Sequence, residues 1–332
     1  MKPRFITELV EGARIDAEYV IRSKELRTAR TGDAYLWLEI SDRSGAIPAV
    51  LFRPSDTARS LPVGAVARVA GSIAKYRGRP RVTVETLVPA ESWDPDDFLQ
   101  PRRRPAAEVE AEFTALVRSV RDAECRGVLR RVFGDASFRG SFMRSPASQS
   151  HHHAYVGGLV EHTIAVSAVC AQLASRYDGV DRDLLVTAAL LHDIGKVDEI
   201  ECDTGVMYSD AGRLIGHVVL GLQRVTRALS ATSLGERRSL LLQHAIVSHH
   251  GELEWGAPKQ PATLEALILH HADNLDAKVA GLSALLAGAT AADEAWTDAQ
   301  NVFRRPLYAP RSALGDRGNR IDEDDVQVLR TA

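Results

Sequence analysis

Hydrophobic and polar residues alternate with a period of two across residues 13–89. In the stretch YLWLEI, Leu36 and Leu38 fall on one face, and Tyr35 and Trp37 fall on the other. Alternation of this kind indicates half-buried strands. Glycine-containing turn signals divide the segment into about five strands, which predicts a small barrel.

Beyond this segment the apolar residues recur at steps of three and four, as in Leu184, Ala188 and Leu191. That spacing is typical of amphipathic helices. Between the two patterns, WDPDDFLQPRRRP combines proline with clustered charge and has no periodicity, as linkers do. The sequence therefore predicts a multidomain chain: a small all-β barrel in residues 1–92, a linker in 93–106, an all-α domain in 107–303 and a polar tail in 304–332.

The composition excludes several classes of protein. With 45% hydrophobic and 26% charged residues among 332, the chain matches an ordinary globular protein. No apolar run approaches the roughly 18 residues that span a bilayer, and charges interrupt the N-terminus where a signal peptide would be apolar. Three distant cysteines without a CxxC pair support neither a disulfide framework nor a thiolate zinc site. We expect a cytoplasmic protein that has no membrane partner.

Charge and histidine are both unevenly distributed. Residues 1–92 carry 15 Lys and Arg against 11 Asp and Glu, whereas the remainder carries 26 against 33. The predicted barrel is therefore basic and the helical domain acidic. All 11 histidines lie between His151 and His271. Imidazole is the commonest metal ligand and acid or base group near neutral pH, so this clustering points to a site in the helical domain.

The order of these histidines and aspartates suits a two-metal centre. Hydrolysis of a phosphodiester near pH 7 needs an activated water and neutralised phosphate charge, and two cations about 3.5 to 4 Å apart supply both. Asp193 follows His192 at the end of an apolar helix, from where one carboxylate could bridge two ions. The predicted metal ligands are His162, His192, Asp193, His217, His249 and Asp273.

The remaining polar residues of this segment are assigned roles other than metal ligand. A solitary buried histidine is more often a hydrogen-bonded core residue than a ligand, and His270 and His271 are read as orientation or packing residues. Lys196 is either a solvated cation or a phosphate contact; we favour a catalytic contact, alongside Asp193, because Gly195 leaves room for a close approach. His249 and His250 are neighbours, and because adjacent helical residues point about 100° apart and usually only one of them faces the site, the ligand role is given to His249. The residues expected to line the site are His152, His153, His250 and Asp276.

The runs SPASQSHHHAYVGGLVEHT, ALLHDIGK, SHHG and LHHADNLDAK together resemble the HD-domain metal-dependent phosphohydrolase superfamily, whose pattern is H…HD…D. The match is closer to one branch, the YhaM family of bacterial 3′-to-5′ exoribonucleases, and the strands that include KYRGRPRV resemble that family's OB-fold domain. The resemblance covers about residues 5–290. It implies two divalent metal ions, with manganese or cobalt usual and iron, nickel or zinc as alternatives. It further implies removal of nucleotides from a 3′ end.

The chain departs from the pattern of the YhaM family in two places. The run His151–His153 has an additional histidine, and the polar C-terminus has no counterpart in the family. The Gly-Tyr-Pro signature of cyclic-di-GMP phosphodiesterases is absent after SHHG, which argues against that activity.

OB barrels bind single strands through aromatic stacking and a basic groove. Aromatic residues on the outside of such a barrel can instead pack against a neighbouring domain. Arginines there can instead lie on an edge strand that is exposed to solvent. The predicted nucleic-acid contacts are Tyr35, Trp37, Phe52, Arg77, Arg79 and Arg81.

The function that these features favour is metal-dependent 3′-to-5′ exonuclease activity on single-stranded RNA, with DNA as a second substrate. One rival is a small-nucleotide phosphohydrolase whose barrel serves assembly or regulation. The other is a non-catalytic RNA-binding scaffold with a structural metal. The sequence leaves the native metal, the preferred sugar and the oligomeric state open, a homo-oligomer included.

Overall fold

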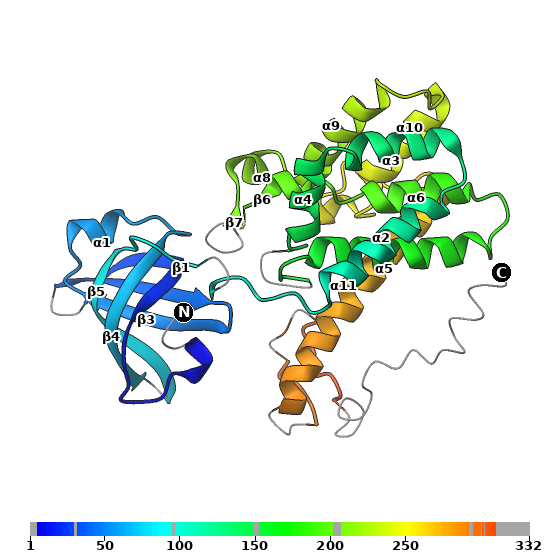
Figure 1. The fold of residues 1–332 in the computed structure, drawn as a ribbon. Helices are drawn as coiled ribbons and strands as arrows, with labels where there is room; N and C mark the ends of the chain where they lie inside the picture. The colour runs from blue at the N-terminus through cyan, green and yellow to red at the C-terminus, as the bar shows by residue number, and fades with distance from the viewer. Residues whose placement is uncertain are drawn as a thin grey trace. The chain divides into compact units, whose positions relative to one another are not determined.

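A computed structural model describes residues 5–29, 32–76, 78–94, 97–148, 153–201, 207–291, 295–299, 301 and 303–309. For Arg79 and residues 287–291 it describes the backbone alone. The chain forms two compact units, Met1–Asn274 and Leu275–Ala332. In Figure 1 a strand-rich part precedes the helices along the chain.

Five strands close into a barrel in which neighbours follow the order β1-β2-β3-β5-β4. All pairs are antiparallel except β3 with β5, which is parallel. A five-stranded barrel of this kind is an OB fold, as the alternating pattern and the resemblance led us to expect. The elements are η1 (Ile6–Glu8), β1 (Arg14–Thr28), β2 (Ala34–Asp42), β3 (Gly45–Phe52), α1 (Asp56–Ser60), β4 (Val66–Tyr76) and β5 (Arg79–Pro89).

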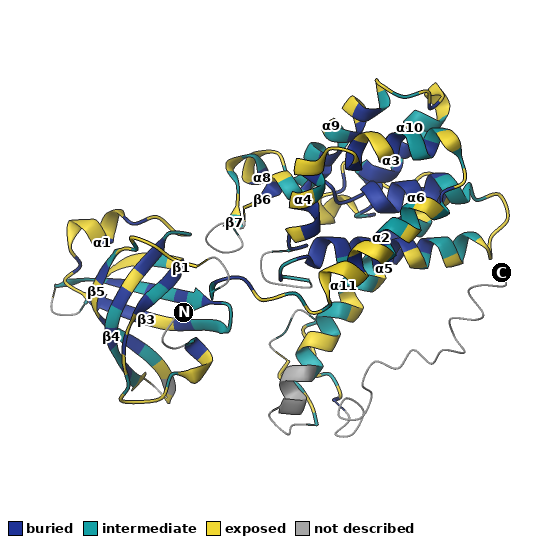
Figure 2. Ribbon diagram, viewed as in Figure 1, coloured by how far each residue is buried: buried dark blue, intermediate teal, exposed yellow. Residues whose placement is uncertain are grey.

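The barrel core consists of the residues that the period of two selects. Leu36 and Leu38 of β2 are buried inside, while Tyr35 and Trp37 stay partly exposed on the outer face. Figure 2 shows buried and exposed positions mixed along the strands of the barrel. Gly71 marks the point where the register between β4 and β5 shifts. A Cβ there would lie 2.3 Å from a backbone oxygen of β5, so only glycine fits this close approach.

The helical part runs from residue 106 onward, and three of its helices begin with an aspartate cap. Asp122, Asp135 and Asp181 accept hydrogen bonds from the first-turn amides of α3, α4 and α6. The ribbon of β6 and β7 is an addition that the helical spacing did not predict. The elements are α2 (Ala106–Ser119), α3 (Ala123–Phe133), α4 (Ala136–Arg144), α5 (Gly158–Ala174), α6 (Arg182–Leu191), α7 (Lys196–Glu199), β6 (Ile200–Glu201), β7 (Met207–Tyr208), α8 (Asp210–Leu214), α9 (His217–Leu229), α10 (Glu236–Ser248), η3 (Leu253–Trp255) and α11 (Leu264–Ala291).

The centre of the helical core is α6, whose residues 184–191 are all buried. It packs against α5, and an aromatic group fills the space beneath α2. There the ring of Phe113 lies 5.0 Å from that of Phe133 and 5.5 Å from that of Phe142, centroid to centroid. The last turn of α6 leads directly into His192 and Asp193, so the best-packed helix of the domain anchors the chemistry-bearing residues.

Two smaller expectations can be compared with the described part of the chain. No helix there is long and apolar enough to cross a membrane. Of the tail expected at 304–332, the structure describes residues 304–309, where Tyr308 pairs with Trp296 in an isolated bridge.

Truncation of the aromatic core should destabilise the helical part. We expect Phe113→Ala to lower the free energy of unfolding by about 3–5 kcal/mol, because the side chain is fully buried and leaves a cavity. Leu240→Ala is the matched control, since Leu240 is 66% exposed and should cost well under ~1 kcal/mol. Chemical denaturation of both variants measures the difference, and equal losses would show that the aromatic group is not a core.

Candidate metal centre

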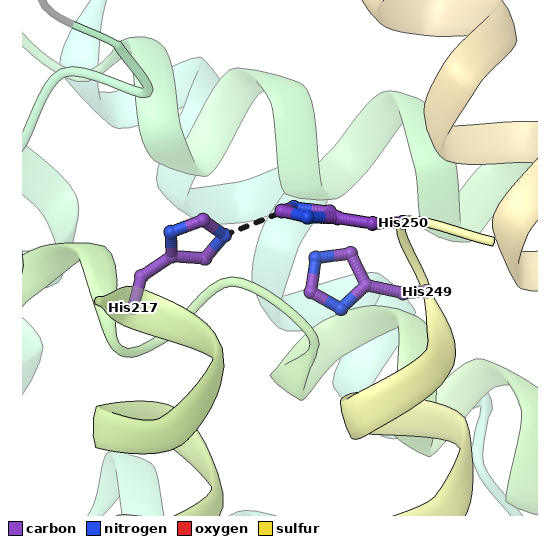
Figure 3. A group of neighbouring side chains, drawn as sticks. All are labelled: His217, His249 and His250. Carbon is purple, nitrogen blue, oxygen red and sulfur yellow. Dashed lines mark hydrogen bonds between the residues drawn. The ribbon is translucent and has the colours of Figure 1, made fainter. Parts of the chain in front are cut away.

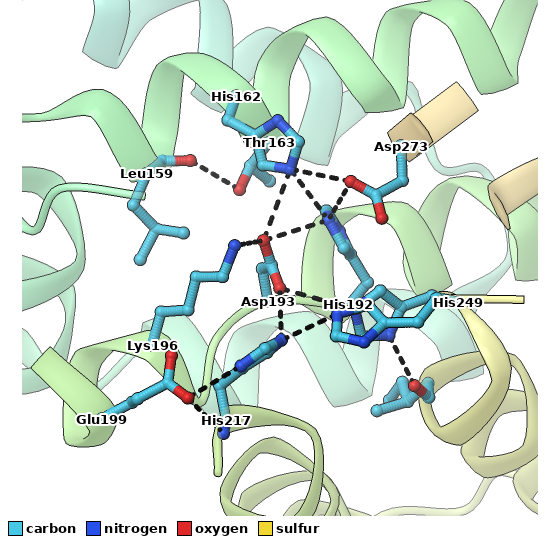
Figure 4. A network of polar contacts seen from close by, with 12 residues as sticks. Leu159, His162, Thr163, His192, Asp193, Lys196, Glu199, His217, His249 and Asp273 are labelled. Carbon is cyan, nitrogen blue, oxygen red and sulfur yellow. Dashed lines mark hydrogen bonds and ion pairs between the residues drawn. The ribbon is translucent and has the colours of Figure 1, made fainter. Parts of the chain in front are cut away.

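Five elements converge to place imidazole and carboxylate groups at one point. His162 projects from the first half of α5, and His192 and Asp193 follow the last turn of α6. The other groups come from the first residue of α9, the end of α10 and the first half of α11. Figure 4 shows the side chains of these residues pointing toward one another.

One oxygen of Asp193 faces a first group of ligand atoms. Its Oδ2 lies 3.3 Å from Nε2 of His162 and 3.4 Å from Nε2 of His192. The two imidazole nitrogens are 3.2 Å apart, and Oδ1 of Asp273 lies 3.2 Å from Nε2 of His162. His162, His192 and Asp193 are buried together and form a group that could hold a metal ion.

The other oxygen of Asp193 faces a second group. Its Oδ1 lies 3.5 Å from Nε2 of His217 and 3.6 Å from Nε2 of His249. Nε2 of His250 lies 3.1 Å from Nε2 of His217, as the dashed line in Figure 3 marks. His217, His249 and His250 also form a group that could hold a metal ion. A single carboxylate therefore stands between two ligand sets.

Hydrogen bonds at the far side of the rings determine which nitrogen is free. Nδ1–H of His192 donates to the carbonyl of Ala189, and Nδ1–H of His249 donates to that of Ile246, each at 2.7 Å. Since a carbonyl can only accept, Nε2 of each neutral ring keeps its lone pair. His250 is arranged in the same way by the carbonyl of Trp255 at 3.0 Å. Nε2 of His192 faces Nε2 of His162, and Nε2 of His250 faces Nε2 of His217, an arrangement that a cation within each group would stabilise.

Unsatisfied polar atoms at the same place support this interpretation. Oδ1 of Asp193 and Nε2 of His249 are buried and make no hydrogen bond with a described residue, and Oδ2 of Asp193 has Lys196 as its charged partner. Buried polar atoms without partners are uncommon in folded proteins and indicate a missing ligand or ion. Imidazole nitrogen and carboxylate oxygen are suitable donors for zinc, manganese, iron, cobalt or nickel.

Electrostatics keep the donors in their ligating forms. Burial opposes ionisation of Asp193, but Lys196 and His192 outweigh it and hold the pKa of that carboxyl well below its usual range. Burial likewise opposes ionisation of Asp273, yet a hydrogen bond from His162 and the nearby imidazoles lower its pKa. Burial, helped by two neighbouring rings, lowers the pKa of His250 to about 3. At neutral pH the carboxylates are charged and His250 is neutral.

Lys196 lies inside this network. Its Nζ is 2.6 Å from Oδ2 of Asp193 and its side chain is 12% exposed, so the alternative of a solvated cation is wrong. Burial would lower the pKa of Lys196, but Asp193 and Asp273 outweigh that effect and raise it. The ammonium group therefore stays charged at the edge of the first ligand set.

Two glycines permit the close packing of the site. A Cβ on Gly195 would lie 2.0 Å from the backbone oxygen of His217, so the space that this glycine leaves is filled by the start of α9 and not by a ligand. Gly251 has φ of +80°, and a Cβ there would lie 2.2 Å from the ring of His270. His270 in turn donates from Nδ1 to the carbonyl of His249 at 2.9 Å, which fits the orienting role expected for it.

Comparison with known proteins adds an independent result. A family model described as "HD domain" matches residues 159–278. The protein named 3′-5′ exoribonuclease YhaM from Bacillus subtilis (strain 168) is 33% identical over 273 residues, which cover 81% of this chain and 86% of the relative. Its namesake from Bacillus velezensis is 32% identical over the same shares. The chain belongs to the YhaM family.

Solved structures with a similar barrel include the second OB-fold domain of replication protein A from Methanococcus maripaludis. That domain is 18% identical, covers 27% of this YhaM-family chain and 97% of its own, and has a TM-score of 0.23.

All six residues that the sequence predicts as metal ligands lie in the metal centre. His250, expected only to line the site, has its ligand atom in the second group, because α10 ends at Ser248 and the helical angle between neighbours no longer applies. The ring of His153 lies 5.7 Å from that of His162, centroid to centroid. His152 lies outside the described residues, and Asp276 belongs to the unit Leu275–Ala332.

The sequence analysis missed Glu199, which is buried beside the second group. Its Oε1 accepts hydrogen bonds from Nδ1 of His217 at 2.9 Å and from the backbone amide of His217 at 3.0 Å. A carboxylate behind a ligating histidine fixes the ring and raises its basicity. The only sequence signal is a carboxylate three residues after Lys196, and many exposed helices have one.

The nominated nucleic-acid residues whose side chains the structure describes, Tyr35, Trp37, Phe52 and Arg81, lie on the outer face of the barrel. Tyr35 and Phe52 are cross-strand partners whose ring centroids lie 5.8 Å apart, and the guanidinium of Arg27 lies over the ring of Trp37. The guanidinium of Arg81 lies 4.3 Å from the ring centre of Tyr76. Arg77 and the side chain of Arg79 lie outside the described residues. The face of strands 2 and 3 is where OB folds bind oligonucleotides.

Removal of the carboxylate charge behind His217 should weaken metal binding at the second ligand group only. We expect Glu199→Gln to lower the affinity of the second ligand group by about 10–100-fold, because His217 loses its orienting carboxylate, while the first group keeps its ion. Titration with Mn²⁺ followed by calorimetry measures both events. Glu201→Gln, an exposed carboxylate two residues further on, is the control. Equal Mn²⁺ affinities in both variants would contradict the role of Glu199.

Proposed function

We propose that the protein is a metal-dependent 3′-to-5′ exonuclease that hydrolyses the phosphodiester bonds of single-stranded RNA. The observation that carries this proposal is the position of Asp193, which offers one buried oxygen to each of two ligand groups. Membership of the YhaM family, whose Bacillus relatives are named 3′-5′ exoribonucleases, supports the choice of reaction and substrate.

The two ligand groups would hold one divalent cation each. In this proposal His162, His192, Asp273 and Oδ2 of Asp193 bind the first ion. The second is bound by Oδ1 of Asp193, His217, His249 and His250. Mn²⁺ is the first candidate, and Co²⁺, Fe²⁺, Ni²⁺ and Zn²⁺ are alternatives that the same donors accept.

Two such cations supply an activated water and offset the charge of the reacting phosphate. The chain's own residues prepare the place where this happens. Asp193 fixes the separation of the two ligand groups, and the carbonyls behind His192 and His249 hold those rings in the ligating tautomer. Lys196, kept charged by Asp193, adds a positive charge at the edge of the first group, where it can face a phosphoryl oxygen.

The barrel would hold the strand without taking part in the chemistry. Every proposed ligand lies in the helical part, whereas Tyr35, Trp37 and Phe52 are available for base stacking on β2 and β3. A stack on each of these rings would be tolerant of sequence, since every base has a π face. Single-stranded RNA is the expected substrate, and we expect the enzyme to work in the cytoplasm.

Incubation of the full chain with Mn²⁺ and 5′-labelled single-stranded RNA tests the activity. We expect the label to shorten progressively from the 3′ end with release of mononucleotides, and duplex RNA to be degraded more slowly. Parallel incubation with a panel of nucleotides examines the small-molecule rival. Turnover of the panel without shortening of RNA would overturn the proposal in favour of that rival.

Loss of the shared carboxylate should abolish the reaction. Asp193→Asn preserves shape but removes the charge, so we expect RNA degradation to fall by at least about 10³-fold, because both ligand groups lose an oxygen donor. Elemental analysis should show less bound metal, and circular dichroism should show the helices intact. Asp178→Asn, an exposed aspartate after α5, is the control. Activity within about threefold of the parent, less than ~1 kcal/mol, would contradict the bridging role.

Removal of an aromatic ring from the barrel should lower the affinity for RNA. Phe52 is 52% exposed, and we expect Phe52→Ala to raise the Kd for a long single strand by about 5–150-fold, the equivalent of ~1–3 kcal/mol of stacking. Binding is measured by fluorescence anisotropy in EDTA, which prevents turnover. Tyr177→Ala removes a ring that is 58% exposed on the helical part and should have no effect. Equal affinities in the two variants would exclude the barrel face as the RNA contact.

A further inference from the structure

An arginine-lined hollow lies on the helical part between α3 and α9, two helices that pack together (Figure 1). It has a volume of about 570 Å³. Arg130 and Arg131 enter it from the last turn of α3, and Arg224 and Arg227 enter it from α9. Four guanidinium groups around one hollow are unexpected in a part of the chain that is acidic overall.

Three of these four arginines lack the counterions that arginines elsewhere on the helices have, and the fourth, Arg224, pairs with Asp198. Arg238, for example, pairs with Asp122 and Asp181 at 3.1 Å each. The side chains of Arg130, Arg131 and Arg227, in contrast, make no ion pair or hydrogen bond with any residue that the structure describes.

The two nearby carboxylates do not neutralise the group. Arg224 pairs with Asp198 at 2.8 Å, but its Nε is buried without a hydrogen-bond partner among the described residues. Asp135 lines the hollow, yet its Oδ1 is engaged by the amides of Ser137 and Phe138 at the start of α4. Unpaired like charges gathered in this way repel one another and are stabilised by an anion.

A second hollow extends the first. It has a volume of about 430 Å³ and shares Arg130 and Arg131, while Thr232 and Ser233 add hydroxyl groups. We call the two hollows, which share these two arginines, the arginine groove. No aromatic side chain lines either hollow, so the groove suits phosphate and sugar and offers nothing on which a base could stack.

The position of the groove relates it to the metal centre. His217 is the first residue of α9, and Arg224 follows it by seven residues, which places both on the same side of the helix about 10 Å apart along its axis. Arg227 lies about 15 Å along. Asp198, the partner of Arg224, belongs to the same short helix as Lys196 and Glu199. The groove therefore lies on α9 about two to three helical turns beyond His217.

We propose that the arginine groove binds the phosphate backbone of single-stranded RNA upstream of the 3′ end that lies in the metal centre. This inference rests on the proposed function and adds a second, sequence-independent RNA contact, separate from the barrel. Guanidinium groups bind phosphate oxygens in pairs of hydrogen bonds, and each contact releases counterions from the strand. Long substrates engage the groove, whereas a trinucleotide fills the metal centre alone.

The double variant Arg130→Gln with Arg131→Gln tests the proposal in the full chain. Both side chains line both hollows and have no described partner, so the melting midpoint should equal that of the parent. Anisotropy in EDTA with labelled oligouridine should show a Kd raised about tenfold and a slope of log K against log salt that is shallower by about 1.4, or ~0.7 for each lost phosphate contact. The Kd of a uridine trinucleotide should move by less than about twofold, well under ~1 kcal/mol.

The matched control is Arg176→Gln with Arg237→Gln, which removes two exposed arginines that lie outside the groove and have no described side-chain partner. Affinity and salt slope that are equal in the two double variants would overturn the proposal. The proposal would also be overturned if inorganic pyrophosphate raises the melting midpoint of the parent but not of the Arg130 and Arg131 double variant, while both bind oligouridine equally well. The groove would then bind a small anion and not RNA. If the parent binds oligouridine with the steep slope but does not degrade it with Mn²⁺, the exonuclease assignment fails and the groove stands.

Discussion

The buried carboxylate of Asp193 imposes the main constraint on the helical part of the protein. Removing a charged carboxylate from water costs several kcal/mol, and only closely placed positive charge or strong donors can offset that cost. Lys196 supplies one charge at 2.6 Å, and the surrounding imidazoles supply ring nitrogens at 3.3 to 3.6 Å. Without a cation Oδ1 of Asp193 has no hydrogen bond with a described residue. The packing around α6 thus holds a site that a bound cation would stabilise further.

Backbone geometry prepares the imidazoles for this task. Main-chain carbonyls at the end of α6 and α10 take the Nδ1 protons of His192 and His249, so the fold selects the tautomer without using an acidic side chain. His217 begins its helix and has no such carbonyl, and Glu199 performs the same function instead. Glycines at 195 and 251 allow the chain to approach closely enough for these contacts to form. The centre is therefore specified as strongly by its supporting shell as by the ligating atoms.

Charge elsewhere in the molecule divides into paired and unpaired groups. Arg238 and its three acidic neighbours connect α3, α6 and α10 and serve the fold. Arg130, Arg131 and Arg227 of the groove have no such ion pairs with described residues, whereas Arg224 pairs with Asp198 of α7. A strand bound by both the groove and the aromatic face of β2 and β3 would be held through its bases on the barrel and through its phosphates on the helices. RNA binding and hydrolysis would then depend on different residues, so that a substitution could change one without changing the other.

The sequence by itself determined the barrel, the helical part and the identity of the ligand candidates, because these depend on periodicity and on the order of rare residue types along the chain. The alternation places Leu36 and Leu38 together on the inward face. The clustering of all eleven histidines in one segment indicates a site in the helical part. The sequence also predicted that Asp193 bridges two ions, but only the tertiary structure decided which of its oxygens faces which ligand group. The inclusion of His250, the support from Glu199 and the meeting of four arginines from α3 and α9 were likewise decided by the tertiary structure. Each of these depends on which atoms of distant segments come within a few ångströms of one another. Such distances follow from the packing of whole helices, and no local pattern encodes them.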